Sequence, residues 1–130
     1  MNAEILCVGT ELLLGDIINT NAPYIARGLA AIGINVFRQS VVGDNPERLK
    51  EALRLALREN DCVITTGGLG PTYDDLTKET MAELFGIKME LNQEALDRIQ
   101  MFFDKIGREM TDNNKKQAWM PQGAVVFYNE

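Results

Sequence analysis

The segment from residue 65 to residue 77 carries the residue types best suited to chemistry in this 130-residue chain, Thr-Thr-Gly-Gly-Leu-Gly-Pro-Thr-Tyr-Asp-Asp-Leu-Thr. Its three glycines follow an apolar run and precede a helical pattern. Such a backbone can pass close to a ligand and turn its N–H groups toward an anion. The segment is not a Walker A loop, because no Gly-Lys-Ser/Thr follows, and it lacks the third glycine of a dinucleotide fingerprint. A tight strand-to-helix turn is the alternative interpretation.

Carboxylates surround this segment. Asp74 and Asp75 lie at its mouth, Asp44 follows the preceding apolar run, and Glu11 belongs to the first loop. Oxygen ligands beside a phosphate site are what Mg²⁺, Mn²⁺ or a similar hard ion requires. Each residue also has a structural interpretation, since Asp44 could cap a helix and Asp75 could form a capping box with Thr72. The spacing favours the cap for Asp44 and leaves Asp75 open.

The charge composition narrows the chemistry further. The chain has no histidine, 13 Lys and Arg and 19 Asp and Glu, which gives a net charge of −6. Without histidine, a Ser-His-Asp triad, a Cys-His pair and an HExxH zinc site are excluded. The acidity also argues against a nucleic-acid groove or an anionic membrane surface as partner. A small phosphorylated ligand stays compatible, because backbone N–H groups or a metal ion can bind phosphate.

The cysteines and the apolar runs indicate where the protein resides. Cys7 and Cys62 each lie in an apolar run, so we expect buried free thiols, with a disulfide between them as the alternative. The sequence has no signal-peptide pattern, and no apolar run is long enough to span a bilayer. We therefore expect a cytoplasmic protein, and the length predicts one domain.

The elements that position these residues follow from hydrophobic periodicity. Three apolar runs of strand length are each ended by a glycine: residues 4–9, 34–42 and 61–66. Residues 10–15 are expected to form a loop. Helices are predicted from about residues 19–32, 44–59, 75–85, 92–106 and 112–120, and a last strand at 124–128.

The order of these elements predicts the fold class. Strands and helices alternate over the first 85 residues, which predicts an α/β fold with a parallel sheet covered on both faces. Ligands on such sheets bind beyond the carboxyl ends of the strands. The loops at residues 9–16, 42–45 and 66–75 are then expected along one edge of the sheet.

The segment from Thr65 to Thr77 closely resembles the signature of the N-terminal domain of the CinA (competence/damage-inducible) family, which is similar to the MogA and MoaB molybdopterin-binding proteins. Further matching segments follow the family order: residues 9–15, 19–21, 42–45, 116–118 and 120–124. The resemblance implies the three-layer α/β sandwich of the molybdopterin-binding (MogA/MoaB-like) fold, with a mainly parallel sheet. It also implies one domain over residues 1–130, truncated at its C-terminal end, because family members continue beyond this point.

The resemblance also implies a site and an activity. Asp44 and Asp75 match two aspartates that serve molybdopterin adenylylation or metal handling in MogA-like relatives. The phosphate-holding glycines match Gly67, Gly68 and Gly70. CinA-type domains are associated with divalent-metal-dependent hydrolysis of ADP-ribose to AMP and ribose 5-phosphate. Where present, a separate C-terminal domain deamidates nicotinamide mononucleotide, and the family's tendency to oligomerise implies a homodimer or another homo-oligomer.

We therefore hypothesise a metal-dependent nucleotide pyrophosphate hydrolase. Asp44 and Asp75 would hold one or two divalent ions (Mg²⁺, Mn²⁺ or Co²⁺), and Asp74, Glu11 or a metal-bound hydroxide would be the base. Three hydroxyls would bind ligand oxygens: Thr10, Thr66 and Thr77. One alternative is a non-catalytic module that binds a nucleotide or molybdopterin. The other is a structural or regulatory dimer that kept the fold and lost the site.

Three weaker candidates complete the set. Lys78 could contact a phosphate or be a solvated surface lysine. Trp119 could stack on a base or a pterin ring, or anchor the core. Met101, Phe102 and Phe103 are expected in the core.

Overall fold

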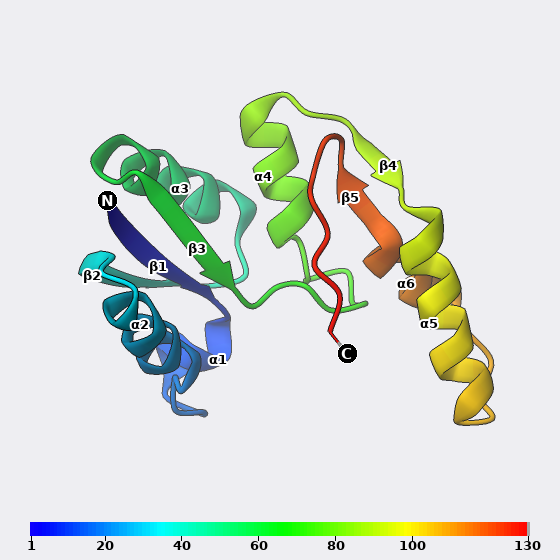
Figure 1. Ribbon diagram of the computed structural model, residues 1–130. Coiled ribbons are helices and arrows are strands. Elements are labelled where there is room, and N and C mark those ends of the chain that lie inside the picture. Colours follow the sequence, from blue (N-terminus) through cyan, green and yellow to red (C-terminus); the bar gives the residue numbers. More distant parts are fainter. Residues whose placement is uncertain (130) are drawn as a thin grey trace.

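The computed structural model describes residues 1–129 and contains a parallel sheet of three strands, which lies on the left in Figure 1. The strands are β1 (Asn2–Val8), β2 (Asn35–Val42) and β3 (Cys62–Thr66), in the order β2-β1-β3. In the register, Val8 lies beside Val42 and Cys7 beside Thr66. The carboxyl ends of all three strands therefore reach the same edge, as the sequence predicted.

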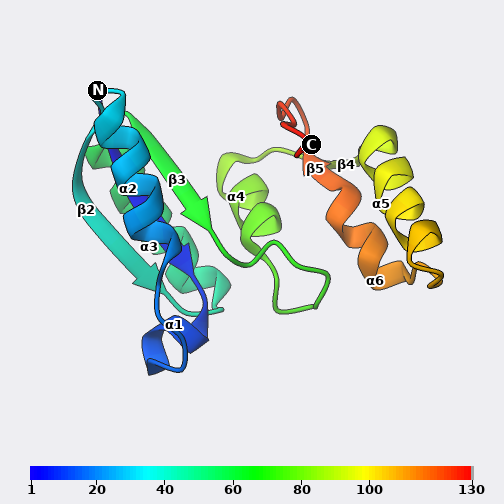
Figure 2. The same ribbon diagram turned by 60° about the horizontal axis from the view of Figure 1, so that its bottom comes forward.

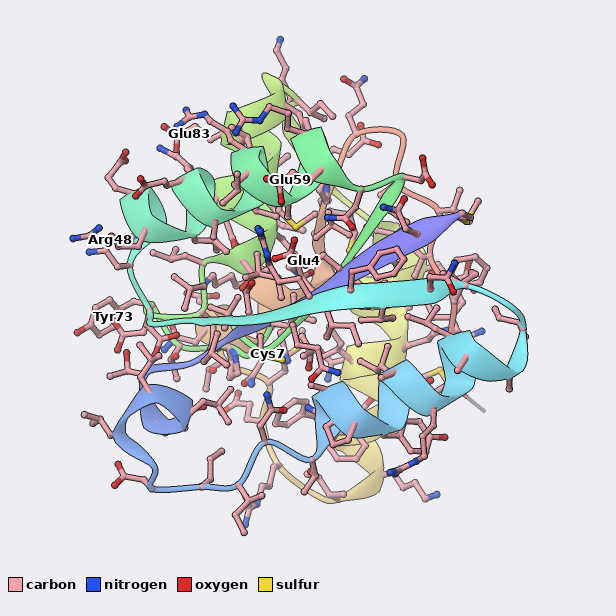
Figure 3. The ribbon with its side chains drawn as sticks, turned by 90° about the vertical axis from the view of Figure 1, so that its left-hand side faces the viewer. Glu4, Cys7, Arg48, Glu59, Tyr73 and Glu83 are labelled. Atoms are coloured by element: carbon pink, nitrogen blue, oxygen red, sulfur yellow. The ribbon has the colours of Figure 1, made fainter. Side chains whose placement is uncertain are left out.

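Helices cover both faces of this sheet. Ala3, Ile5 and Cys7 of β1 pack on one side against α2 (Asn21–Ala31). Leu6 and Val8 point to the other side, against α3 (Pro46–Glu59). Figure 3 shows the three layers, with α3 and α2 on opposite sides of the strands. Burial on both faces explains why β1 is a continuous apolar run rather than an alternating one, and the predicted three-layer α/β class is confirmed.

The remaining elements lie around and beyond this sheet. They are α1 (Thr10–Leu14), α4 (Thr77–Phe85), β4 (Met89–Leu91), α5 (Gln93–Lys105), α6 (Asp112–Lys115), the short 3₁₀ helix η1 (Lys116–Ala118) and β5 (Trp119–Pro121). Figures 1 and 2 place α6 and β5 between α4 and α5. None of the helices in residues 1–129 combines the length and the apolar character needed to cross a membrane.

Two helix starts differ from the sequence prediction. Helix α3 is capped by Asn45, whose side chain accepts a hydrogen bond from the Arg48 N–H (3.0 Å). The cap interpretation of Asp44 was therefore wrong. Helix α4 begins at Thr77 rather than at residue 75, because the Asp75 side chain closes a turn with Thr72 before the helix. Residues 10–14, expected as a loop, form the one-and-a-half-turn helix α1.

The C-terminal elements also differ. Residues 112–118 are helical as predicted, but the strand predicted at 124–128 is irregular, and β5 lies earlier, at Trp119–Pro121. β5 pairs antiparallel with β4, which the sequence analysis did not predict. Three-residue strands exist through pairing rather than through their own periodicity. Their positions were therefore not visible in the hydrophobic pattern.

The aromatic residues of α5 are a further correction. Met101 and Phe102 were expected in the core, yet their side chains are 69% and 58% exposed. Phe103 is partly buried and meets the Phe102 ring edge-on. The buried position of α5 is Ala95, one turn from its N-terminal cap at Asn92.

The two cysteines and one buried carboxylate lie in the strands of the parallel sheet. Cys7 is buried, Cys62 is partly buried, and both are free thiols, as expected. Glu4, only 2% exposed, accepts hydrogen bonds from Ser40 (2.6 Å) and Asn60 (3.1 Å). The cost of burying this carboxylate is offset by these bonds, and Glu4 lies toward the end of β1 opposite the candidate site.

Candidate active site

Three glycines meet where the parallel strands end. Gly9, Gly43 and Gly67 follow β1, β2 and β3, and the Gly9 N–H donates to the carbonyl oxygen of Val42 (2.9 Å). Gly67 lies against the end of β1 with a φ of +91°, and a Cβ there would collide with the carbonyl oxygen of Val8. A glycine is required because the chain both turns left-handed and touches its neighbour's backbone.

Thr77 fixes the first part of the glycine-rich loop. Its hydroxyl donates to the carbonyl of Gly67 (2.9 Å), its N–H donates to the carbonyl of Gly68 (3.1 Å), and the residue is buried. The carbonyl of one residue and the N–H of the next point in opposite directions in a trans peptide. The N–H groups of Gly68 and Leu69 therefore point away from Thr77. Two adjacent outward N–H groups form a suitable contact for an anion.

The first and second loops hold each other through reciprocal hydrogen bonds. The Thr10 N–H donates to Oδ2 of Asp44 (3.1 Å), and the Asp44 N–H donates to the hydroxyl of Thr10 (3.0 Å). Asp44 is thereby oriented by the start of α1 instead of capping α3. Asp44 is exposed and lines a cavity beside the end of β1.

A small cavity brings two predicted carboxylates together. Asp44 and Asp74 both line it, with Asn45 and Thr77 among the other lining residues. Its volume is about 10 Å³, which is room for one water-sized sphere. Asp44 and Asp74 therefore line one small space on the α3 and α4 side of the sheet.

A second cavity of about 120 Å³ lies on the α2 side. Glu11, Thr66 and Gly67 line it, together with Asn21, whose side-chain amide donates to the hydroxyl of Thr66 (3.1 Å). Val8 lines both cavities, so they flank the end of β1. Of the predicted site residues, Glu11 and Thr66 are thus separated from Asp44 and Asp74 by the strand end.

Asn19 and Asn21 are site residues that the sequence analysis missed. Both line the larger cavity, and the Asn19 side-chain oxygen accepts from the Ala22 N–H (3.2 Å). The sequence analysis placed both only at the start of the helix predicted from residue 19 and in a family-matching segment. Helix α2 begins at Asn21 with Thr20 in the N-cap position, and the turn before it forms a wall of the larger cavity.

Asp75 has a different environment. Its Oδ2 accepts hydrogen bonds from the N–H (3.0 Å) and the hydroxyl (2.6 Å) of Thr72. The predicted link between Thr72 and Asp75 is present, but it closes a turn before α4. The hydrogen bond from the Thr72 side chain is the main reason why the pKa of Asp75 lies below its ordinary value. A Cβ at Gly70 would approach Asp75 Oδ2 to 2.6 Å, so a side chain there would displace this carboxylate.

The predicted roles of Asp75, Thr77 and the glycines stay predictions. Asp75 and Thr77 bond within the loop, and Gly67, Gly68 and Gly70 are each in close contact with neighbouring atoms. Within residues 1–129, no three Asp, Glu, Cys or His side chains form a ready-made metal cluster.

Changing Asp75 to asparagine is expected to remove part of the acid sensitivity of the protein. The native pKa of Asp75 is lowered, so its contribution to stability is complete above the ordinary value of 3.8 and is lost as the pH falls through the lower native pKa. At pH 7 we expect D75N to be less stable by about 1 kcal/mol, below the usual value for a hydrogen bond to a charged group because the turn is open to water. Urea unfolding at pH 7 and at pH 3 measures this difference, which should narrow at pH 3. An equal difference at both pH values would contradict it.

The chain matches a known protein family over nearly its whole length. The family model described as "Probable molybdopterin binding domain" matches residues 4–128, which is nearly the whole chain. The chain belongs to the molybdopterin-binding domain family. The resemblance inferred from the motifs is therefore confirmed, and the parallel sheet and the glycine-rich loop described above are those of a family member.

Similar sequences place this family member with the CinA-type proteins. A "Putative competence-damage inducible protein" of Acetivibrio thermocellus is 61% identical over 99% of this chain. A "CinA-like protein" of Dictyoglomus thermophilum is 56% identical over the whole chain. The chain spans about a third of the length of these relatives, 31% and 32% respectively.

Similar solved structures agree. A CinA crystal structure from Thermoplasma acidophilum, a protein described there as of unknown function, has a TM-score of 0.83 and 38% identity. The match covers 93% of this chain and 70% of that one. The molybdopterin biosynthesis enzyme MoaB of Thermus thermophilus has a TM-score of 0.60 and 33% identity, covering 63% and 53% of the two chains. The MogA/MoaB-like fold is thus confirmed.

Proposed function

We propose that this CinA-type domain is a metal-dependent hydrolase of a nucleotide pyrophosphate, with ADP-ribose as the preferred candidate. The single observation that carries the proposal is the shared cavity of Asp44 and Asp74. Thr77, which lines this cavity, also bonds the glycine-rich turn, whose N–H groups on the side away from Thr77 suit a phosphate. The chain has no histidine, so oxygen ligands and carboxylate bases are the means of hydrolysis available to it.

The residues present fit a hard divalent ion. Mg²⁺ is usually bound by one or two protein carboxylates, and water and substrate phosphates supply its other ligands. The cavity between Asp44 and Asp74 offers two carboxylates and the room of a single water. We therefore assign the ion to Asp44 and Asp74. Asp75 is assigned a structural role, since its carboxylate accepts hydrogen bonds from Thr72 and closes the turn. Mg²⁺, Mn²⁺ and Co²⁺ all fit this set of oxygen atoms.

Each of the other site residues then has a proposed role. When bound, the ion would neutralise charge on the two phosphates. The N–H groups of Gly68 and Leu69 would hold the pyrophosphate, and Thr66 and Asn21 would contact the sugar or ring in the larger cavity. Glu11, in that cavity, would take a proton from the attacking water. The water oxygen joins one phosphorus, and the bridging oxygen leaves with the other, giving AMP and ribose 5-phosphate.

A second candidate function is a non-catalytic binding module for a nucleotide or molybdopterin. It is favoured by the description of the matching family and by the similarity to MoaB. Titration calorimetry distinguishes the two functions. The binding module predicts tight binding without added metal and no product, whereas the hydrolase predicts turnover that requires metal.

A screen of metals against substrates tests the hydrolase. We expect ADP-ribose to be cleaved with Mg²⁺, Mn²⁺ or Co²⁺ and to stay intact with EDTA. Ribose 5-phosphate and AMP, which lack a pyrophosphate, serve as controls and should not react. Cleavage of a phosphate monoester at the same rate would contradict a pyrophosphate-specific site.

Two proposals concern the whole protein. The relatives are about three times as long as this chain, and we propose that a C-terminal nicotinamide mononucleotide deamidase domain accompanies this one in the full-length protein. Assembly as a homodimer or another homo-oligomer is also a proposal. Light scattering of the full-length protein measures the number of subunits.

A further inference from the structure

Lys116 reaches the glycine-rich loop from a distant part of the chain. From η1, its ammonium group donates to the backbone carbonyl of Thr72 (2.6 Å) and to that of Asp75. These two carbonyls lie on either side of Tyr73 and Asp74 in the sequence. One cation therefore closes the turn that carries Asp74.

The contact is reciprocal. Lys78, in the first turn of α4, donates to the carbonyls of Gln117 (3.0 Å) and Trp119 (2.8 Å), and more weakly to that of Lys116 (3.4 Å). Lys78 was expected either at a phosphate or in solvent, and the structure instead places it against the backbone at the end of η1. Burial lowers the pKa of this amine. Each segment thus supplies the lysine that binds the other segment's carbonyls.

The turn that carries Asp74 is otherwise lightly held. Within it, the Asp75 N–H donates to the Thr72 carbonyl (3.2 Å), and Oδ2 of Asp75 accepts from Thr72. Tyr73 is 84% exposed and projects from the surface (Figure 3). The bonds from Thr72 and Asp75 to each other stay within four residues, so they do not fix where the turn lies. Thr77 holds the following residues to Gly67 and Gly68, and Lys116 holds the turn itself to η1.

From this geometry we infer that Lys116 is a positioning residue for Asp74. It holds the turn so that Asp74 stays at the cavity that Asp44 also lines. The inference rests on the proposed function for its effect on turnover, whereas its effect on the loop does not depend on that function. It makes the segment from α6 to β5 part of the site, although no residue of this segment lines either cavity at the strand ends.

The neighbouring lysine provides a matched control. Lys115 pairs with Asp112 within α6 (3.1 Å), three residues away, and its side chain is 48% exposed. Substituting either lysine removes the same charge from adjacent positions. Only Lys116 reaches the loop, so a difference between the two variants reports on that contact.

The experiment compares K116M, K116R and K115M with the wild type by hydrogen exchange and by metal-dependent turnover of ADP-ribose. In K116M we expect amide exchange over residues 68–76 to rise about 10-fold and kcat to fall roughly 10- to 100-fold, the cost of misplacing a catalytic group. K115M should match the wild type. K116R, which keeps a donating cation, should restore both quantities to within about threefold.

Two results would overturn the inference. One is exchange in the loop that K116M leaves unchanged. The other is a loop that exchanges faster while kcat stays at the wild-type value. If the wild type itself shows no turnover, the proposed function fails separately. The inference is then decided by the exchange data and by Mn²⁺ affinity measured by electron paramagnetic resonance, which should fall at least about 10-fold in K116M alone.

Discussion

Replacing Asp44 by asparagine is expected to lower metal-dependent turnover of ADP-ribose by about 100- to 1,000-fold, because a bound divalent ion contributes several kcal/mol to transition-state stabilisation. Asparagine has nearly the same shape as aspartate, and its side-chain oxygen can still accept from the Thr10 N–H. The substitution therefore removes the charge and keeps the tie between the first two loops. Initial rates at saturating Mg²⁺ measure the effect.

Substituting Asp74 should have an effect similar to substituting Asp44. Asp74 lines the same small space as Asp44, so D74N should show a loss of similar size. The double variant should lose little more than either single one, because the two side chains act on one ion. D97N on α5 is the control, since Asp97 is exposed and accepts from Gln93 within its own helix. Wild-type turnover in D44N would contradict the assignment.

Replacing Gly67 by alanine is expected to destabilise the fold by about 2–5 kcal/mol, from backbone strain and overpacking together. The residue has a φ of +91°, and an added Cβ would meet the backbone carbonyl of Val8. Neither the strand end of β1 nor the start of the loop can move without breaking the contacts described above. Urea unfolding monitored by far-ultraviolet circular dichroism measures the loss.

Gly28 supplies the matched control for this substitution. It lies within α2, and no atom approaches within 4 Å of the place where its Cβ would be. Alanine is the better helix former, so G28A should gain roughly 0.5–1 kcal/mol. Opposite signs for the two alanine variants would locate the effect in the glycine turn. A loss of the same size in both would show that the local geometry of Gly67 is not the cause.

The parallel sheet could be predicted from the sequence because its physical causes are local and periodic. Three apolar runs, each ended by a glycine, gave β1, β2 and β3 to within a few residues. Parallel pairing then placed the loops after them along one edge without any knowledge of side-chain contacts. The two short strands β4 and β5 lacked such a signal, since each depends on the other across 28 to 32 residues of chain.

The sequence could not show in the same way which carboxylates line a common cavity. Asp74 and Asp75 are adjacent in sequence, and the family resemblance pointed to Asp75. In the structure, Thr72 donates hydrogen bonds to the Asp75 carboxylate and closes a turn, and Asp74 lines the same cavity as Asp44. A shift of one residue along a loop is decided by hydrogen bonds such as these and by the tie from Lys116, which comes from a segment 41 residues away. Neither the hydrogen bonds of the turn nor the contact from Lys116 produces a periodic pattern in the sequence.

The central claim is that a divalent ion at Asp44 and Asp74 makes this domain a pyrophosphate hydrolase. Its most direct test follows ADP-ribose by phosphorus NMR in one sample of the protein, first with EDTA-treated components, then with Mg²⁺, and then with excess EDTA. The proposal predicts no change at first, then AMP and ribose 5-phosphate appearing in equal amounts, and then an immediate stop. Intact ADP-ribose with each of Mg²⁺, Mn²⁺ and Co²⁺, or cleavage that continues in EDTA, would contradict it.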